Sequence, residues 1–189
     1  MSKKNKYSVI LPTYNRADTY LRDAIDSIVN QTYENWELLI IDNHSTDKTK
    51  ELVKSYKKNN IKLLTNYTRG NIAKSRNLGI KKASGDYISF IDSDDTWEPE
   101  KLEKCEKIYQ TTPDVLVCHA EKWRYENNKI KIVQYGPEIN ATYKNLLING
   151  NCLSLSATVV PIFFFRKIGY FSERSDIISA EDYDLCTDY

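Results

Sequence analysis

Three carboxylates lie within four residues at Asp92-Ser93-Asp94-Asp95, directly after an apolar run that ends at Ile91. Like charges this close together repel one another, so the cluster needs water, a helix N-terminus or a cation beside it. Carboxylate oxygens are the ligands that hard divalent cations such as Mn²⁺ and Mg²⁺ prefer. The cluster is therefore a candidate metal site. A solvated turn that caps a helix beginning near Pro99 is the alternative interpretation.

Two further polar clusters follow apolar segments in the same way. Thr13-Tyr14-Asn15-Arg16 comes after the run that ends at Pro12, and Asp42-Asn43-His44-Ser45 comes after the run over residues 36–41. Buried strands that alternate with helices form a mostly parallel sheet, and such a sheet binds ligands at the carboxyl ends of its strands. The three clusters therefore predict one shared site.

The hydrophobic periodicity predicts the elements that position this site. The expected strands cover residues 7–11, 36–41, 61–64 and 87–91, and the expected helices cover residues 19–31, 46–59, 71–83 and 99–112. After residue 112 we expect strands over residues 114–123, 129–135 and 157–165, a short helix over residues 143–148 and a last helix from residue 179. The predicted fold class is α/β, with a smaller mixed-β back half.

The composition excludes several classes of protein. The chain has 189 residues with 27 basic and 26 acidic side chains, so it lacks the basic excess of a nucleic-acid-binding protein. No apolar run is long enough to span a bilayer, and we expect a cytoplasmic protein. The basic N-terminus (Lys3, Lys4 and Lys6) is a solvated tail or a weak contact with the inner face of the cell membrane. The spacing of the four cysteines fits no zinc site and predicts free thiols.

The common phosphate-binding and nucleophile motifs are missing. The sequence contains no GxGxxG, no GxxxxGK[ST] and no GxSxG. A phosphate group would therefore need a metal ion or basic side chains instead of a glycine-rich loop.

Five segments together resemble family 2 glycosyltransferases, and they occur in the order found in that family. They are Val9–Arg16, Leu39–Asp47, Asn71–Gly79, Gly85–Asp95, and Gly169–Glu173 followed by Glu181–Leu185. The resemblance covers nearly the whole chain. It implies a GT-A fold in a single domain over residues 1–189, with a nucleotide-sugar-binding half (1–112) and an acceptor-side half (113–189). It also implies an inverting transfer from a nucleotide sugar to a polysaccharide or glycolipid hydroxyl.

The resemblance assigns a role to each cluster. Asp94 becomes the direct ligand of Mn²⁺ or Mg²⁺, and Asp92 contacts the ribose or the metal. Asp42 accepts a hydrogen bond from the ring N–H of the base, which fits a UDP-sugar best, although guanine also carries such a donor. The remaining residues expected to bind the nucleotide sugar are Pro12, Thr13, Tyr14, Arg16, Arg76 and Ser93. A solvated helix face is the alternative for Arg76.

The resemblance makes Asp182 the catalytic base, and Glu181 orients either the acceptor or Asp182. The alternative is that both residues occupy the first turn of a helix, where acidic side chains suit the helix dipole. The chain stops seven residues after Asp182, whereas members of the family usually continue, and we expect an acceptor side that is short at the C-terminus. His44 stands where the family usually has glycine, which leaves the geometry of that loop open.

Two other functions compete with this prediction. The first is a non-catalytic nucleotide-sugar-binding module, or a truncated transferase remnant that acts with a partner. The second is a nucleotidyltransferase on a related sheet. It is disfavoured because residues 11–16 contain no glycine.

Overall fold

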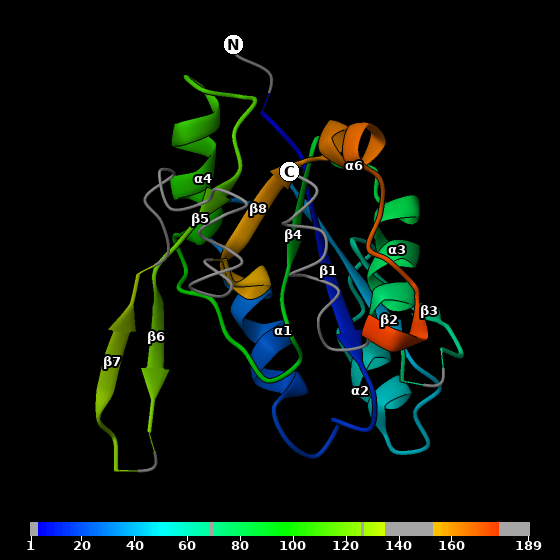
Figure 1. The fold of residues 1–189 in the computed structure, drawn as a ribbon. Helices are drawn as coiled ribbons and strands as arrows, with labels where there is room; N and C mark the ends of the chain where they lie inside the picture. Colours follow the sequence, from blue (N-terminus) through cyan, green and yellow to red (C-terminus); the bar gives the residue numbers. More distant parts are fainter. Residues whose placement is uncertain (1–3, 69, 126, 135–152, 178–189) are drawn as a thin grey trace.

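A six-stranded sheet forms the centre of the computed structural model, which describes residues 4–68, 70–125, 127–134 and 153–177 (Figure 1). The strand order is β3-β2-β1-β4-β8-β5. The first four strands along the chain, β1 (Tyr7–Thr13), β2 (Trp36–Asp42), β3 (Ile61–Thr65) and β4 (Tyr87–Phe90), are parallel. Their carboxyl ends therefore meet at one edge of the sheet, as predicted.

The back half of the chain completes the same sheet. β8 (Thr158–Pro161) runs antiparallel to β4, and β5 (Val117–Cys118) runs antiparallel to β8. A separate hairpin is formed by β6 (Glu121–Arg124) and β7 (Ile130–Val133). The expected α/β class with a mixed back half is confirmed.

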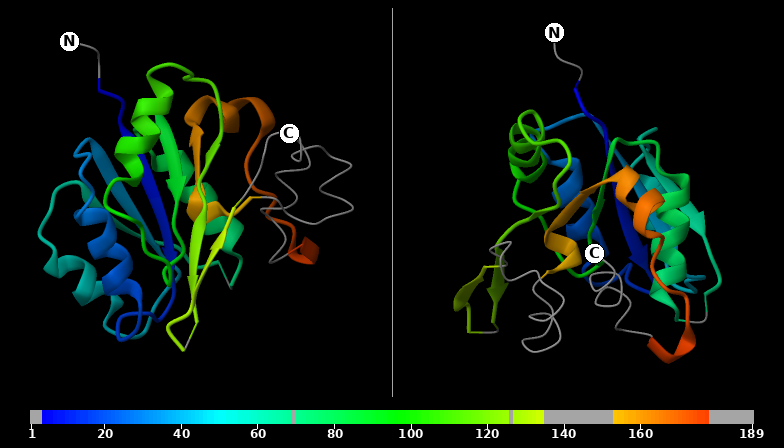
Figure 2. Two further views of the ribbon diagram at one scale, coloured as in Figure 1. Left: turned by 90° about the vertical axis from the view of Figure 1, so that its left-hand side faces the viewer. Right: turned by 45° about the horizontal axis from the view of Figure 1, so that its top comes forward.

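Helices cover both faces of the sheet (Figure 2). One face packs against α1 (Leu21–Val29), α2 (Thr49–Ser55) and α4 (Lys101–Tyr109), and the other against α3 (Ile72–Lys82) and α6 (Ile162–Ile168). Alternate side chains of each buried strand enter the two cores, because successive residues of a strand point to opposite faces. Val9 and Leu11 lie in the first core and Ile10 in the second. Within the described residues, the 3₁₀ helices η2 (Leu155–Ala157) and η3 (Ser175–Ile177) lie on either side of β8 and α6.

The predicted strand over residues 157–165 is wrong in its second half. β8 ends at Pro161, and α6 begins at the next residue. Proline suits this position, because it has no N–H to pair and its fixed φ fits a helix entry. The helical turn buries Phe165 against Phe90 and Phe171 in edge-to-face and tilted contacts. An apolar run this short fits either element, so periodicity alone does not decide between them.

The predicted strand over residues 114–123 is also wrong, because the structure divides it into β5 and β6. The chain leaves the sheet at His119, whose amide N–H donates to the Ala157 carbonyl while its ring lies 3.0 Å from the Cys105 sulfur. The predicted helices over residues 143–148 and from residue 179 lie outside the described residues. None of the helices in the described ranges combines the length and hydropathy needed to cross a bilayer.

A buried carboxylate links neighbouring segments at the amino-terminal edge of the sheet. Glu37 on β2 accepts hydrogen bonds from the Ser8 hydroxyl at 2.7 Å, from the Ser84 amide at 2.7 Å and from the Lys62 ammonium at 2.8 Å. Burial alone would raise the pKa of Glu37, but the hydrogen bonds from Lys62, Ser84 and Ser8 outweigh it and lower the pKa from 4.5 to about 2. Ionised Glu37 therefore stabilises the folded state.

We predict that Glu37→Gln lowers the free energy of unfolding at pH 7 by about 2 kcal/mol, the usual value of hydrogen bonds to a charged group. Because the folded pKa lies below the unfolded one, this contribution is complete above about pH 4.5 and disappears as the pH falls towards 2. Urea unfolding from pH 7 to pH 2.5 should show the two proteins converging in acid. A constant difference over that range would contradict the assignment.

Candidate functional site

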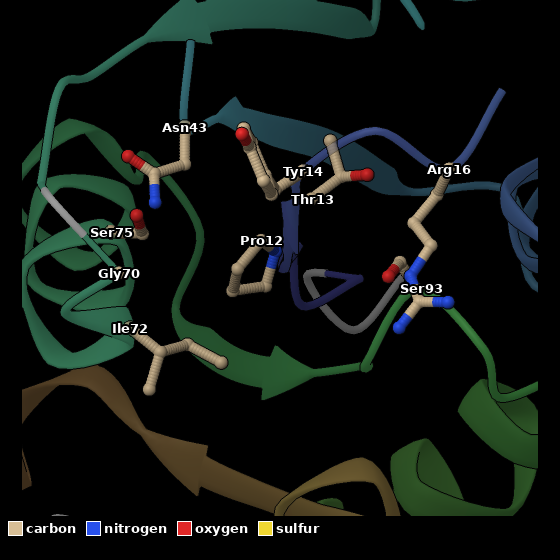
Figure 3. A pocket seen from close by; sticks show the side chains of 9 residues that line it. All are labelled: Pro12, Thr13, Tyr14, Arg16, Asn43, Gly70, Ile72, Ser75 and Ser93. Carbon is tan, nitrogen blue, oxygen red and sulfur yellow. The ribbon is translucent and has the colours of Figure 1, made fainter. Parts of the chain in front are cut away.

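A cavity of about 280 Å³ opens at the carboxyl edge of the sheet (Figure 3). Its wall comes from the loops after β1, β2 and β4 and from the start of α3. The lining residues are Pro12, Thr13, Tyr14, Arg16, Asn43, Gly70, Ile72, Ser75 and Ser93. Five of the predicted binding residues (Pro12, Thr13, Tyr14, Arg16 and Ser93) are therefore brought together in one site.

The loop after β1 supplies the aromatic and cationic groups of the cavity. Tyr14 is 56% exposed, so its ring is available to a ligand. Arg16 is the charged side chain among the described lining residues, and its guanidinium lies on the same side of the cavity as Ser93 of the β4 loop (Figure 3). A planar cation beside hydroxyl groups can bind a phosphate.

Asp42 ends β2 directly behind this wall. It is fully buried and pairs in register with Thr13. Its Oδ1 accepts the Ser45 amide N–H at 2.9 Å, whereas its buried Oδ2 has no hydrogen-bond partner within the described part of the chain. The Lys50 ammonium lies 4.0 Å from Oδ2. Asp42 does not itself line the cavity, but Thr13 and Asn43 on either side of it do.

His44 adopts a backbone conformation that glycine enters more easily than other residues. Its φ is +62°, in the left-handed region that a non-glycine residue enters at a cost of about 1–2 kcal/mol. The exposed His44 ring lies edge-on to Tyr67, with the ring centroids 5.5 Å apart. Histidine at this position therefore tolerates the left-handed backbone and makes an aromatic contact with Tyr67.

Arg76 lies in an ion pair that the sequence did not reveal. It is only 4% exposed, and its Nη2 donates to Asp92 Oδ1 at 3.0 Å. Its guanidinium also lies 5.7 Å from the centre of the Phe171 ring. A solvated helix face is therefore wrong for Arg76. The ion pair instead joins α3 to the carboxylate turn after β4.

The carboxylate turn presents oxygen atoms towards solvent. Asp94 is exposed, and the Asp92 side chain is 41% exposed although one of its oxygens is engaged by Arg76. Desolvation raises the pKa of the Asp95 carboxyl, and the charges of Asp92 and Asp94 raise it further. Two hard oxygen donors held this close suit Mn²⁺ or Mg²⁺, which commonly use one or two carboxylates and complete their shell with water and phosphate oxygens. No cluster of three or more potential metal ligands occurs in the described ranges.

Ser156, in η2, is a positioning residue that sequence reasoning missed. Its hydroxyl accepts the Asp92 amide N–H at 3.0 Å. Its carbonyl accepts the Trp97 indole N–H at 2.9 Å and the buried Lys101 ammonium at 2.6 Å. Burial lowers the pKa of Lys101 to about 7. No motif marks a lone serine 64 residues from the turn that it holds.

The sequence assigns no individual binding role to the remaining lining residues. Asn43 belongs to the polar cluster after residue 41, and its Oδ1 accepts the Thr68 amide N–H at 2.8 Å while its side chain lines the cavity. Gly70 has a φ of +86°, and a glycine just before a predicted helix is the signal that could have marked it. Glu181 and Asp182 lie outside the described residues.

We predict that Ser156→Ala loosens the carboxylate turn without unfolding the protein. Loss of one neutral hydrogen bond is worth about 1 kcal/mol, so hydrogen exchange at the Asp92 amide should accelerate about fivefold. The amide of Ile40, in the core, serves as the internal reference, and Ser156→Thr restores the hydroxyl. Unchanged exchange at Asp92 in Ser156→Ala would show that the hydroxyl does not hold the turn.

Comparisons with known proteins agree with this geometry. A family model described as "Glycosyl transferase family 2" matches residues 8–170. The UDP-Glc:alpha-D-GlcNAc-diphosphoundecaprenol beta-1,3-glucosyltransferase WfgD of Escherichia coli is 46% identical over 162 residues, which are 84% of this chain and 63% of WfgD. An uncharacterised glycosyltransferase of Haemophilus influenzae is 38% identical over 185 residues, which are 96% of this chain and 70% of that protein.

A solved structure supports the fold as well. Residues 1–349 of S. aureus TarS, in complex with UDP-GlcNAc, superpose with a TM-score of 0.78 at 26% identity, covering 97% of this chain and 52% of that one. The chain thus spans about half of the TarS fragment and under two thirds of WfgD. The family match, the identity to these relatives and the shared fold confirm the resemblance: the chain belongs to glycosyltransferase family 2.

Proposed function

We propose that this chain is the donor-binding and catalytic part of an inverting, metal-dependent glycosyltransferase. It transfers a sugar from a UDP-sugar to a hydroxyl of a polysaccharide or glycolipid. The observation that carries the proposal is the cavity at the carboxyl edge, with a buried carboxylate behind its wall and a carboxylate turn beside it. The name of WfgD states a UDP-glucose donor and a lipid-linked acceptor, and TarS was solved with UDP-GlcNAc, which supports the choice of donor.

The base of the donor is assigned to the side of the cavity next to Asp42. A buried carboxylate oxygen that accepts no hydrogen bond from the described residues is costly, and a ligand that donates a hydrogen bond to it recovers that cost. Uracil carries such a donor at N3. Tyr14, which is exposed on the same wall, offers an aromatic face on which the base can stack.

The diphosphate is assigned to the side of the cavity that holds Arg16 and Ser93. Asp94, with the exposed oxygen of Asp92, would hold Mn²⁺ or Mg²⁺. When bound, that cation supplies positive charge beside the diphosphate as the leaving group gains negative charge. Arg76 holds Asp92 in place, and Ser156 holds the turn from the other side.

The proposed chemistry is a single displacement at the anomeric carbon. An acceptor hydroxyl attacks that carbon, the bond from the carbon to the diphosphate oxygen breaks, and UDP leaves with the bonding electrons. Asp182 takes the proton of the attacking hydroxyl as general base, and Glu181 orients the acceptor or Asp182. This assignment rests on the match of residues 181–185 to the family motif.

We predict that Asp94→Ala removes the metal-dependent part of UDP binding. Calorimetric titration of UDP in the presence of Mn²⁺ should show at least about tenfold weaker binding for Asp94→Ala, the loss expected for a carboxylate contact of about 1.5 kcal/mol or more. With excess EDTA the variant and the wild type should bind UDP alike. Asp114→Ala, an exposed carboxylate before β5, is the control. Equal Mn²⁺-dependent binding by Asp94→Ala and the wild type would contradict the metal assignment.

We predict that Asp182→Asn lowers transfer from UDP-[¹⁴C]glucose to an α-GlcNAc-diphosphate lipid by about 10²–10⁴-fold, the usual contribution of a general base. UDP affinity should stay unchanged, because the base contacts the acceptor hydroxyl. Asp184→Asn, two residues along the same motif, is the matched control. Full activity of Asp182→Asn would refute the base assignment. A wild-type protein that binds UDP but transfers no sugar from a panel of UDP-sugars would instead be a non-catalytic module.

A further inference from the structure

The β6–β7 hairpin stands outside the six-stranded sheet (Figures 1 and 2). In Figure 1 its tip points the same way as the carboxyl ends of β1 and β2, so it extends along the side of the molecule that holds the cavity. The two strands pair over four residues, from Glu121↔Val133 to Arg124↔Ile130. A two-stranded ribbon of this length has little stability alone, so its surface composition calls for an explanation.

Large apolar side chains cover this hairpin. Trp123 is 48% exposed, Tyr125 47%, Ile130 57% and Ile132 62%. The strand pairing places Ile130 and Ile132 on one face of the ribbon, and Trp123 and Tyr125 on the other, because cross-strand partners share a face and successive residues alternate. Single exposed apolar residues are ordinary, but large apolar side chains on both faces of one short ribbon mark an interaction surface. We call these four residues the hairpin patch.

Basic side chains are interleaved with the hairpin patch. Lys122 stands opposite Ile132, Arg124 opposite Ile130, and Lys131 opposite Trp123. Lys129 adds a fourth basic side chain, whereas the sequence over residues 121–133 contains two carboxylates, Glu121 and Glu126. Arg124, Lys129 and Lys131 form no ion pair with any other residue in the described ranges. The hairpin is therefore cationic on a chain whose net charge is only +1.

Two contacts fix the hairpin relative to the candidate site. The Lys122 ammonium forms a 2.6 Å ion pair with Glu98, which lies between the carboxylate turn and α4. The Ser154 hydroxyl donates to Glu121 Oε1, and Ser154 immediately precedes η2, which contains Ser156. These contacts link the hairpin to Glu98, which follows the carboxylate turn, and to the segment that contains Ser156, which contacts that turn.

We propose that the β6–β7 hairpin docks on a bilayer surface rich in anionic phospholipid. Because apolar side chains stand on both faces, the ribbon would enter the bilayer surface edge-on. The isoleucine side chains would then reach the boundary between head groups and acyl chains, Trp123 and Tyr125 would lie at the interface itself, and Lys and Arg side chains would reach the phosphates. An acidic protein surface would pair with the basic side chains, but it would leave the isoleucine side chains exposed unless it also offered a matching apolar groove. The purpose of the docking rests on the proposed function, because it brings the cavity to a membrane that carries a glycolipid acceptor.

The chain carries its own probe for this proposal. Of the three tryptophans, Trp36 and Trp97 are buried at 6% and 8% exposure, so a ligand-induced change in emission reports on Trp123. We would titrate the full chain with vesicles of phosphatidylcholine alone and with vesicles that contain phosphatidylglycerol, following Trp emission and co-sedimentation. UDP binding by calorimetry, measured without vesicles, separates failure of the docking from failure of the donor site.

The expected result is a blue shift and sedimentation with phosphatidylglycerol vesicles only, and Trp123→Phe should abolish the shift. Lys129→Glu with Lys131→Glu should weaken vesicle binding by more than about tenfold, at roughly fivefold for each basic side chain lost. Ile130→Ser with Ile132→Ser should also release the protein while UDP binding persists. The matched control is Lys81→Glu with Lys82→Glu, the same charge change at the C-terminal end of α3, which should bind the vesicles far better than Lys129→Glu with Lys131→Glu.

Three results would overturn the proposal. The first is no binding of the wild-type chain to phosphatidylglycerol vesicles. The second is equal binding by the hairpin variants and the wild type. The third is a concentration-dependent dimer in analytical ultracentrifugation that Ile130→Ser with Ile132→Ser abolishes, together with no binding to vesicles. That result would assign the hairpin patch to a contact with a second copy of the chain.

Discussion

Asp42 and Asn43, at the end of β2, connect the loops at the carboxyl edge of the sheet. The candidate site depends on this edge. The Asp42 carbonyl accepts the Asn66 amide N–H at 2.8 Å, and the Asn43 amide N–H donates to the Thr13 carbonyl at 2.9 Å. Together with the bond from the Thr68 amide to Asn43, these contacts fix the loops after β1 and β3 to the loop between them. The parallel sheet sets this constraint, because it brings three loops to one edge where their polar groups must satisfy one another.

Charged and polar side chains hold the carboxylate turn beside these loops. The turn after β4 concentrates carboxylates, and the protein holds it from two sides, with buried Arg76 on Asp92 and Ser156 on the Asp92 amide. These contacts leave Asp94 exposed instead of neutralising it. An unneutralised carboxylate beside an arginine-containing cavity matches a ligand that brings both a cation and phosphates, as a metal–nucleotide complex does.

Much of this architecture could be predicted because parallel strands are buried on both faces and therefore occur as continuous apolar runs. Those runs located the strand ends and placed Thr13, Tyr14, Arg16 and Ser93 at one cavity. Residues 157–165 misled the prediction, because an apolar run interrupted by Pro161 fits a strand and a buried helix equally well. The burial of Arg76 and the role of Ser156 could not be predicted, since both arise from tertiary contacts between segments far apart in the sequence.

We propose that the carboxylate of Asp42 recognises the base of the donor, and titration with UDP and CDP tests this proposal most directly. Uracil donates a hydrogen bond from N3, whereas cytosine only accepts one there. The wild-type chain should bind UDP at least about tenfold more tightly than CDP, and Asp42→Asn, whose amide can donate, should shift the preference towards CDP. Equal affinity of the wild-type chain for UDP and CDP, or an equal loss of both in Asp42→Asn, would contradict the account.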